Sequence, residues 1–169
     1  MTMNIETIHQ YGRVYSENPS RVRLASRAFL VDGGKILLSH ELNTGVYLIP
    51  GGGAEGEETA EECCIREIRE ETGYDVKPIE QSLEIHEHFR EILYVSRYFI
   101  CEITGKGDQN LTESEIEHGV VPEWVEIEKA LEIFGSYSDY DDVDEEIAGQ
   151  YKREYTAINH YLKYTAFAN

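Results

Sequence analysis

The chain has 169 residues, of which 33 are acidic and 15 basic, and its formal net charge is −18. Hydrophobic residues make up 41% of it, which is enough to build a core and excludes a largely disordered chain. So acidic a protein is short of the Lys and Arg side chains that bind nucleic-acid phosphates or anionic membrane surfaces. The composition therefore predicts a folded protein with no stable nucleic-acid partner and no membrane partner.

Cysteine usage and the N-terminal residues indicate the compartment. Cys63, Cys64 and Cys101 are too few and too irregularly spaced for a disulfide framework or a C-x-x-C pair, which fits a reducing compartment. The N-terminal residues lack the charged and apolar regions of a signal peptide. No apolar run approaches the roughly 18 residues that span a bilayer. We expect a cytoplasmic protein.

Strand-forming residues and glycines dominate the segment from residue 23 to residue 53. Strands at 23–32 and 35–40 flank two glycines, which predicts a hairpin with a Gly-Gly turn. A further short strand at 46–49 ends at a Pro-Gly-Gly-Gly run.

The next segment carries signals for both ends of a helix. Thr59 followed by Glu62 predicts a capping box at the start, and Gly73 predicts the end. The apolar face expected to pack on the core consists of Ala60, Cys64, Ile65 and Ile68.

The second half of the chain continues the mixture of strands and helices. The predicted elements are strands at 76–89 and 92–103, a polar loop at 104–118, a strand at 123–127 and a helix at 129–134. A longer helix at 144–164 has an apolar stripe that predicts docking on the rest of the chain, with a homodimer contact as the alternative. Together the elements predict an α/β or α+β fold.

Three carboxylates on the helix after Thr59 point to metal chemistry. At about 100° per residue, Glu67, Glu70 and Glu71 share one arc at the margin of the apolar face. Like charges so close repel one another, and the helix dipole disfavours anions near the C-terminus. The spacing directs Arg66 and Arg69 away from this arc. Mg²⁺ or Mn²⁺, which prefer oxygen ligands, would neutralise the cluster; the alternative is a solvated acidic face.

The spacing around these carboxylates resembles the signature of the Nudix hydrolase family, G-x5-E-x7-R-E-U-x-E-E-x-G-U, in which U is a bulky apolar residue. The required positions are held by Gly52, Glu58, Arg66, Glu67, Ile68, Glu70, Glu71 and Gly73. Tyr74 takes the last apolar position, where the family usually has an aliphatic residue. The resemblance extends over about 22–135 and leaves 140–169 as a C-terminal helical extension of one domain spanning 1–169.

The resemblance implies a fold, a reaction and a metal site. The fold would be an α/β/α sandwich with a mixed β-sheet. The reaction would be Mg²⁺-dependent hydrolysis of a phosphoanhydride, with water attacking phosphorus, in a nucleoside diphosphate linked to another group or in a nucleoside triphosphate. By the same resemblance, Glu67, Glu70 and Glu71 would bind metal together with a backbone carbonyl near Gly51 or Gly52.

Other site residues follow from the same resemblance. Arg66 would orient a signature glutamate, and Gly52 would let the backbone approach the phosphates. The general base would be a signature glutamate (Glu67 or Glu70) or a glutamate of the later loop, where Glu117 is the best candidate.

Arg23 and Arg27 are the candidate phosphate-binding side chains. They lie an even number of residues apart and would share one face of a strand. They would either bind substrate phosphates or form surface salt bridges.

Two other patterns are weaker. His86 and His88 share a strand face but lack a third ligand with zinc spacing. The acidic run at 139–146 lacks the ligand spacing of an EF-hand.

The sequence leaves the substrate open, since motifs that select ADP-ribose, dinucleoside polyphosphates or coenzyme A are not evident. Two alternatives to an enzyme also remain. One is a catalytically weak Nudix-type module that binds or senses a nucleotide, and the other is an acidic interaction protein with a chance match.

Overall fold

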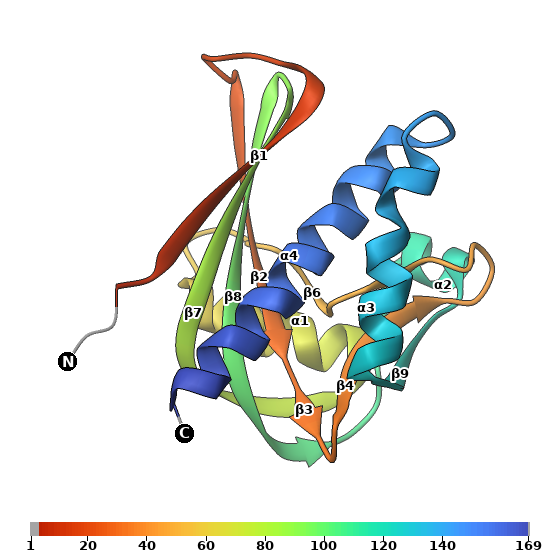
Figure 1. The fold of residues 1–169 in the computed structure, drawn as a ribbon. Helices are drawn as coiled ribbons and strands as arrows, with labels where there is room; N and C mark the ends of the chain where they lie inside the picture. The colour runs from red at the N-terminus through yellow and green to blue at the C-terminus, as the bar shows by residue number, and fades with distance from the viewer. Residues whose placement is uncertain (1–3, 169) are drawn as a thin grey trace.

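The computed structural model describes residues 4–168, which form two β-sheets with helices on both sides (Figure 1). The larger sheet contains, in spatial order, β1 (Glu6–Tyr15), β7 (Tyr74–Arg90), β8 (Ile92–Lys106), β2 (Arg21–Phe29) and β6 (Gly51–Gly53). The smaller sheet contains β3 (Val31–Asp32), β4 (Lys35–Glu41), β5 (Tyr47–Leu48) and β9 (Val120–Glu126). Strands β1 and β7 pair in parallel, as do β2 and β8, whereas β7 and β8 are antiparallel. The predicted mixed sheet is confirmed.

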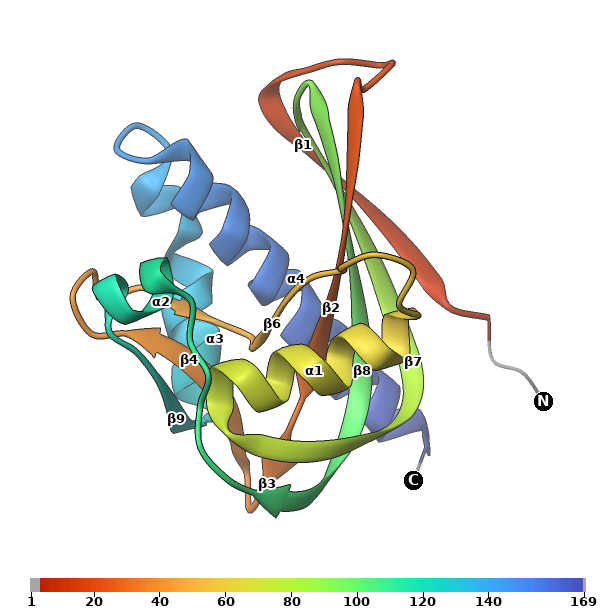
Figure 2. The ribbon, with the colours of Figure 1, turned by 180° about the vertical axis from the view of Figure 1, so that it is seen from behind.

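Helices cover both faces of the larger sheet. The helices are α1 (Ala60–Thr72), α2 (Glu113–His118), α3 (Ile127–Gly135) and α4 (Glu145–Ala168), with a 3-10 helix η1 (Ser136–Tyr140) before α4. Helix α1 lies on one face and α4 on the other (Figures 1 and 2). Neighbouring strand residues therefore enter different cores: Phe29 packs on the α4 side and Ala28 on the α1 side. This is the predicted α/β/α arrangement.

The predicted hairpin forms only at its tip. Gly33 and Gly34 have φ of 55° and 78°, as a type I′ turn requires, and Val31 pairs with Ile36. Upstream of this tip, β2 leaves the smaller sheet and pairs with β8 and β6. The expectation of one long strand paired across the turn is therefore wrong, because the partners of β2 lie far away in the sequence.

Helix α1 begins and ends as predicted, but its buried face differs. The side chains and backbone amides of Thr59 and Glu62 form the capping box, and Gly73 ends the helix with φ of 80°. Ile65, expected in the core, is 43% exposed, whereas Cys63 is fully buried. The buried arc is thus rotated toward the carboxylates, and Glu71 lies inside it.

In three segments the secondary structure exceeds what the sequence predicted. The N-terminal residues, outside the Nudix resemblance, form β1 on the edge of the larger sheet. The expected polar loop contains α2, which Thr112 and Glu115 cap in the same way as α1. Strand β7 begins two residues earlier than predicted.

The C-terminal helix docks on the core as expected. Its apolar stripe joins the larger core cluster through Tyr151 and Ile158, while Ile147, Tyr155 and Leu162 pack against that cluster. The homodimer contact stays a prediction. Among the described residues, no helix is both long and apolar enough to cross a membrane.

Candidate active site

A cleft of about 890 Å³ opens between β2, the glycine run and α1, and α2 and α4 also contribute to its walls. Six of the residues singled out from the sequence line it: Arg23, Arg27, Gly51, Gly52, Glu67 and Glu71. Basic side chains thus come from β2 and acidic ones from α1. The cleft therefore suits an anionic ligand that is accompanied by a cation.

The glycine run packs directly against the carboxylates of α1. The Gly51 amide donates a hydrogen bond to the Glu71 carboxylate over 3.0 Å. A Cβ atom at Gly52 would overlap the Glu67 carboxylate, and one at Gly51 would lie 2.7 Å from Arg27 Cα. These two positions need glycine because the backbone approaches its neighbours so closely.

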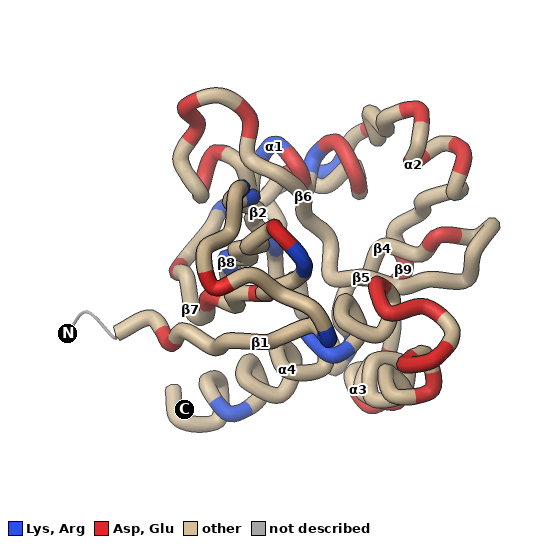
Figure 3. Tube along the Cα trace, turned by 90° about the horizontal axis from the view of Figure 1, so that it is seen from above, with Lys and Arg blue, Asp and Glu red and all other residues tan. Residues whose placement is uncertain are grey.

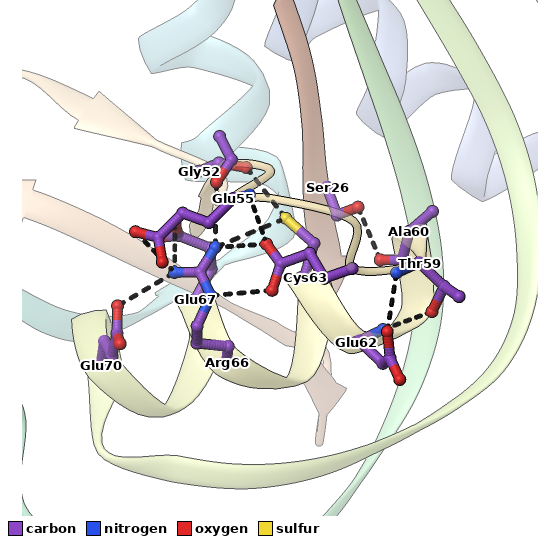
Figure 4. Close-up of polar contacts among 12 residues, drawn as sticks. Ser26, Gly52, Glu55, Thr59, Ala60, Glu62, Cys63, Arg66, Glu67 and Glu70 are labelled. Atoms are coloured by element: carbon purple, nitrogen blue, oxygen red, sulfur yellow. Dashed lines mark hydrogen bonds and ion pairs between the residues drawn. The ribbon is translucent and has the colours of Figure 1, made fainter.

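Arg66 is the counter-charge of the carboxylate cluster (Figure 4). Its guanidinium donates hydrogen bonds to Glu58 over 2.6 Å, to Glu67 over 2.8 Å and to Glu70 over 3.1 Å. It also donates to the Gly53 carbonyl, which fixes the glycine run to α1. The expectation that Arg66 points away from the cluster is wrong, because Glu70 lies one helical turn further on, at i+4, within reach of the guanidinium. Arg69 does point elsewhere and pairs with Asp75.

Burial and the charge of Arg66 shift the pKa values of the carboxylates in opposite directions. The hydrogen bonds from Arg66 lower the pKa of Glu58 to about 2. Burial raises the pKa of Glu67, against the opposing effect of Arg66. Burial raises the pKa of Glu71 to about 7, although the Gly51 amide and the charge of Arg27 oppose it. The ionised form of Glu71 is buried here, and a further cation beside it would stabilise that form.

The donor set of the cluster fits a hard divalent cation. Glu67, Glu70 and Glu71 offer oxygen atoms only, as Mg²⁺ and Mn²⁺ prefer. Within residues 4–168, however, no three His, Cys, Asp or Glu side chains are already grouped as metal ligands. Arg66 donates from the same Nη1 atom to Glu67 and to Glu70, and so supplies the positive charge between these two carboxylates.

The two arginines of β2 have different surroundings. Arg27 donates to the Ile49 carbonyl over 3.2 Å and contacts Ser96 Oγ over 3.4 Å, so it holds the chain ahead of the glycine run. The guanidinium of Arg23 lies beside Gly53 and forms no ion pair among the described residues. Arg23 is therefore the freer of the two to bind an anion.

The structure brings a different glutamate of the 104–118 segment to the cleft. Glu117 is exposed and does not line it, whereas Glu115 does. The charge of Glu115 contributes to the raised pKa of both Glu67 and Glu71. The role of general base expected for Glu117 stays a prediction, and Glu115 is the glutamate of this segment that reaches the cleft. The capping box formed by Thr112 and Glu115 was the signal in the sequence that could have identified this helix.

Of the two weaker patterns, the histidines lie outside the cleft, whereas the acidic run reaches its wall through Glu146. His86 bonds Glu84, and His88 lies 3.0 Å from His9 of β1, a neighbour that the sequence did not reveal. In the acidic run, Asp142 pairs with Arg13, and Asp144 accepts the amides that begin α4.

A family model described as "NUDIX domain" matches residues 21–146. The match covers most of the chain and extends beyond the resemblance seen in the sequence, up to the start of α4.

Individual relatives are more distant. The protein YtkD of Bacillus subtilis (strain 168), whose name proposes 8-oxo-dGTP diphosphatase activity, is 34% identical over 89 residues, which are 53% of this chain and 53% of YtkD. The chain thus spans about half the length of this curated relative.

Solved structures share the fold. A NUDIX hydrolase from Nitrosomonas europaea matches with a TM-score of 0.56 and 20% identity over 80% of this chain and 88% of that one. The E. coli ORF135 protein matches with a TM-score of 0.54 and 17% identity over 82% and 91%.

Proposed function

Because the chain belongs to the NUDIX domain family, we propose that it is a divalent-metal-dependent pyrophosphohydrolase of small nucleotides. It would cleave a phosphoanhydride in a nucleoside triphosphate or in a nucleoside diphosphate linked to another group, by attack of water at phosphorus. The observation that carries this proposal is the cleft in which arginines of β2 face the buried carboxylates of α1 across a strip of glycine backbone.

Each part of the cleft has a distinct task in this proposal. Arg23 binds substrate phosphate, and the bare backbone at Gly51 and Gly52 lets the diphosphate lie close to the carboxylates. Glu67, Glu70 and Glu71 would hold Mg²⁺ or Mn²⁺ with the carbonyl of Gly51 or Gly52. When bound, the cation would neutralise phosphate charge and stabilise the charge that develops on the bridging oxygen.

Arg66 and Glu58 act as positioning residues. The guanidinium holds Glu67 and Glu70 in fixed orientations, and Glu58 keeps the guanidinium in place with two hydrogen bonds. Such preorientation lowers the reorganisation needed during the reaction. Glu115 would accept the proton of the attacking water, since its carboxylate lies across the cleft from α1.

Product analysis tests the proposal. Nucleoside triphosphates, oxidised deoxynucleotides, ADP-ribose, nucleotide sugars, dinucleoside polyphosphates and NADH are incubated with Mg²⁺ or Mn²⁺. We expect wild type to cleave one of these classes at a phosphoanhydride, and Glu67→Gln, Glu70→Gln and Glu71→Gln each to reduce turnover at least about tenfold. Glu61→Gln, at an exposed position of the same helix, is the matched control. Unaltered rates in all three variants would overturn the metal assignment.

The alternative is a nucleotide-binding or sensing module with weak catalysis. The observation that favours it is that Arg66 already neutralises Glu67 and Glu70. An absence of turnover across the panel, combined with a nucleotide-dependent rise in Tm, would favour this alternative.

A further inference from the structure

A second cavity of about 380 Å³ lies between α4 and the strands β1, β7 and β8. Its volume is within the range of roughly 300–1,000 Å³ that is usual for small-molecule sites. Four residues line both this cavity and the catalytic cleft: Tyr94, Glu146, Gln150 and Arg153. The two spaces therefore adjoin one another at these residues, and we name the second one the α4 chamber.

Arg153 lies where the two cavities meet, and its side chain is held in place by two carboxylates. Its side chain is only 6% exposed, and it donates to Glu87 over 2.8 Å and to Glu154 over 2.6 Å. Its Nη2 atom is buried and has no hydrogen-bond partner among the described residues. A buried donor without a partner has lost its hydrogen bonds to water without replacement, which disfavours the folded state. A ligand that supplies an acceptor here would remove that penalty.

Two further side chains with polar groups that lack hydrogen-bond partners in the described part of the chain lie where the cavities meet. No described residue hydrogen-bonds the side-chain amide of Gln150 or the hydroxyl of Tyr94, and the ring of Tyr94 stacks on no other described ring. An aromatic face with nearby donors and acceptors binds flat heteroaromatic rings by stacking and hydrogen bonding.

The charge of the α4 chamber distinguishes it from the cleft. Its lining has four acidic and four basic side chains, several of them paired, as in Arg153 with Glu87. Such a lining offers no net attraction for phosphate, whereas Arg21, Arg23 and Arg27 line the cleft. The phosphates would therefore stay in the cleft, and the chamber suits a neutral group that forms hydrogen bonds.

We propose that the α4 chamber binds the nucleobase of a nucleotide whose phosphates lie in the cleft, through Tyr94, Gln150 and Arg153. The proposal rests on the nucleotide substrate inferred above, and it assigns substrate selection to α4. Nearly all of α4, residues 147–168, lies beyond the match to the family model. Of the three residues, Gln150 and Arg153 thus come from the segment beyond the match, and Tyr94 comes from β8 within it.

Equilibrium binding tests the proposal without turnover. AMP, GMP, CMP, UMP and ribose 5-phosphate are titrated into the full chain by calorimetry with Mg²⁺ present. We expect at least one nucleoside monophosphate to bind wild type at least about tenfold more tightly than ribose 5-phosphate, a difference that stacking and one or two hydrogen bonds provide. Gln150→Leu and Tyr94→Leu should abolish this difference while leaving ribose 5-phosphate binding unchanged.

Controls use the same residue types outside both cavities. Gln81→Leu and Tyr164→Leu should bind as wild type does. If Tyr94→Leu fails to fold, Gln150→Leu, at a half-buried position on α4, decides the outcome. The proposal is overturned if no monophosphate binds better than ribose 5-phosphate, or if the chamber variants discriminate as well as wild type.

Hydrolysis of the nucleotide panel separates this proposal from the proposed function. Cleavage by wild type, with the base preference unaltered in Gln150→Leu, refutes the α4 chamber alone. Base-dependent binding that requires Gln150, without hydrolysis of any nucleotide, refutes the enzyme and supports the chamber.

Discussion

At the scale of single residues, two opposing effects act on the ionisation of Glu71 in the cleft. Its side chain is buried inside the core-facing arc of α1, where the charged form is disfavoured, yet the Gly51 amide and the charge of Arg27 favour that form. The pKa of about 7 reflects the balance in the metal-free protein. A cation bound beside the carboxylate would shift this balance toward the charged form.

Glu71 gives the first prediction, on stability against pH. Its pKa is about 7 in the folded chain, against 4.5 for an ordinary glutamate, so folding favours the protonated carboxyl. The metal-free protein should lose stability as the pH rises from about 4.5 to 7, since only the unfolded chain then ionises freely. Glu71→Gln should therefore raise the free energy of unfolding at pH 8 by on the order of 2 kcal/mol.

Urea unfolding in EDTA at pH 5 and pH 8 measures this effect. Glu71→Gln should show a smaller difference between the two pH values than wild type, and Glu61→Gln should behave as wild type. Identical pH dependence in wild type and Glu71→Gln would show that the carboxyl of Glu71 is ionised at no cost in the folded chain.

At the scale of secondary-structure elements, α4 supports the chain segment that leads into the cleft. Its Glu154, fully buried, accepts hydrogen bonds from the Ile49 amide over 3.1 Å and from the Tyr98 hydroxyl over 3.2 Å. Arg27 binds the carbonyl of the same Ile49. This residue is thus held from both sides just before the glycine run, once from α4 and once from β2.

The second prediction removes this support. Glu154→Leu leaves the Ile49 amide, the Tyr98 hydroxyl and Arg153 Nε without their acceptor, so we expect a loss of about 3–5 kcal/mol in the free energy of unfolding. Glu154→Gln keeps one acceptor oxygen and should lose less. Urea denaturation gives both values, and hydrogen exchange at the Ile49 amide should accelerate in both variants. Loss of stability no larger than in the exposed control Glu128→Leu would contradict this role of α4.

The elements also show which features a sequence can predict. The caps of α1 and the turn at Gly33 and Gly34 depend on neighbours within a few residues, and these predictions were correct. The parallel pairing of β1 with β7 joins residues almost eighty positions apart, and no local pattern specifies it. The same holds for β2, whose strand partners are β6 and β8 rather than β4.

The residues of the candidate site also divide into those that a local sequence pattern selects and those that depend on tertiary contacts. The signature spacing selected Glu67, Glu70 and Glu71, and in the structure Gly52 packs against Glu67 and Gly51 bonds Glu71. The metal-binding role of the three glutamates stays a prediction. The expectation for Arg66 overlooked that Arg66 and Glu70 are an i,i+4 pair, about 40° apart around the helix, whose side chains are neighbours. The choice between Glu115 and Glu117 depended on α2, and the part played by Arg153 depended on the docking of α4 against β7.

At the scale of the whole molecule, the net charge of −18 opposes the approach of an anionic nucleotide. Acidic residues recur along α2 and in the segment after α3 (Figure 3). Arginines of β2, by contrast, line the cleft. At 0.1 M salt, charges interact over about 10 Å. Salt therefore screens the distant acidic residues more strongly than it weakens the contact of a bound phosphate with Arg23.

The third prediction follows from this difference in range. For an anionic nucleotide at a fixed free Mg²⁺ concentration, kcat/KM should rise about two- to fivefold as KCl increases from about 20 to about 200 mM, because the repulsion during approach is screened. Glu128→Gln combined with Asp139→Asn removes two exposed charges outside the cleft and should make this rise smaller. Steady-state kinetics of wild type and the double variant measure both slopes. A fall of kcat/KM with salt would instead mean that the arginines of β2 dominate the electrostatic potential that the approaching nucleotide meets. The excess of acidic residues would then have no part in the rate of association.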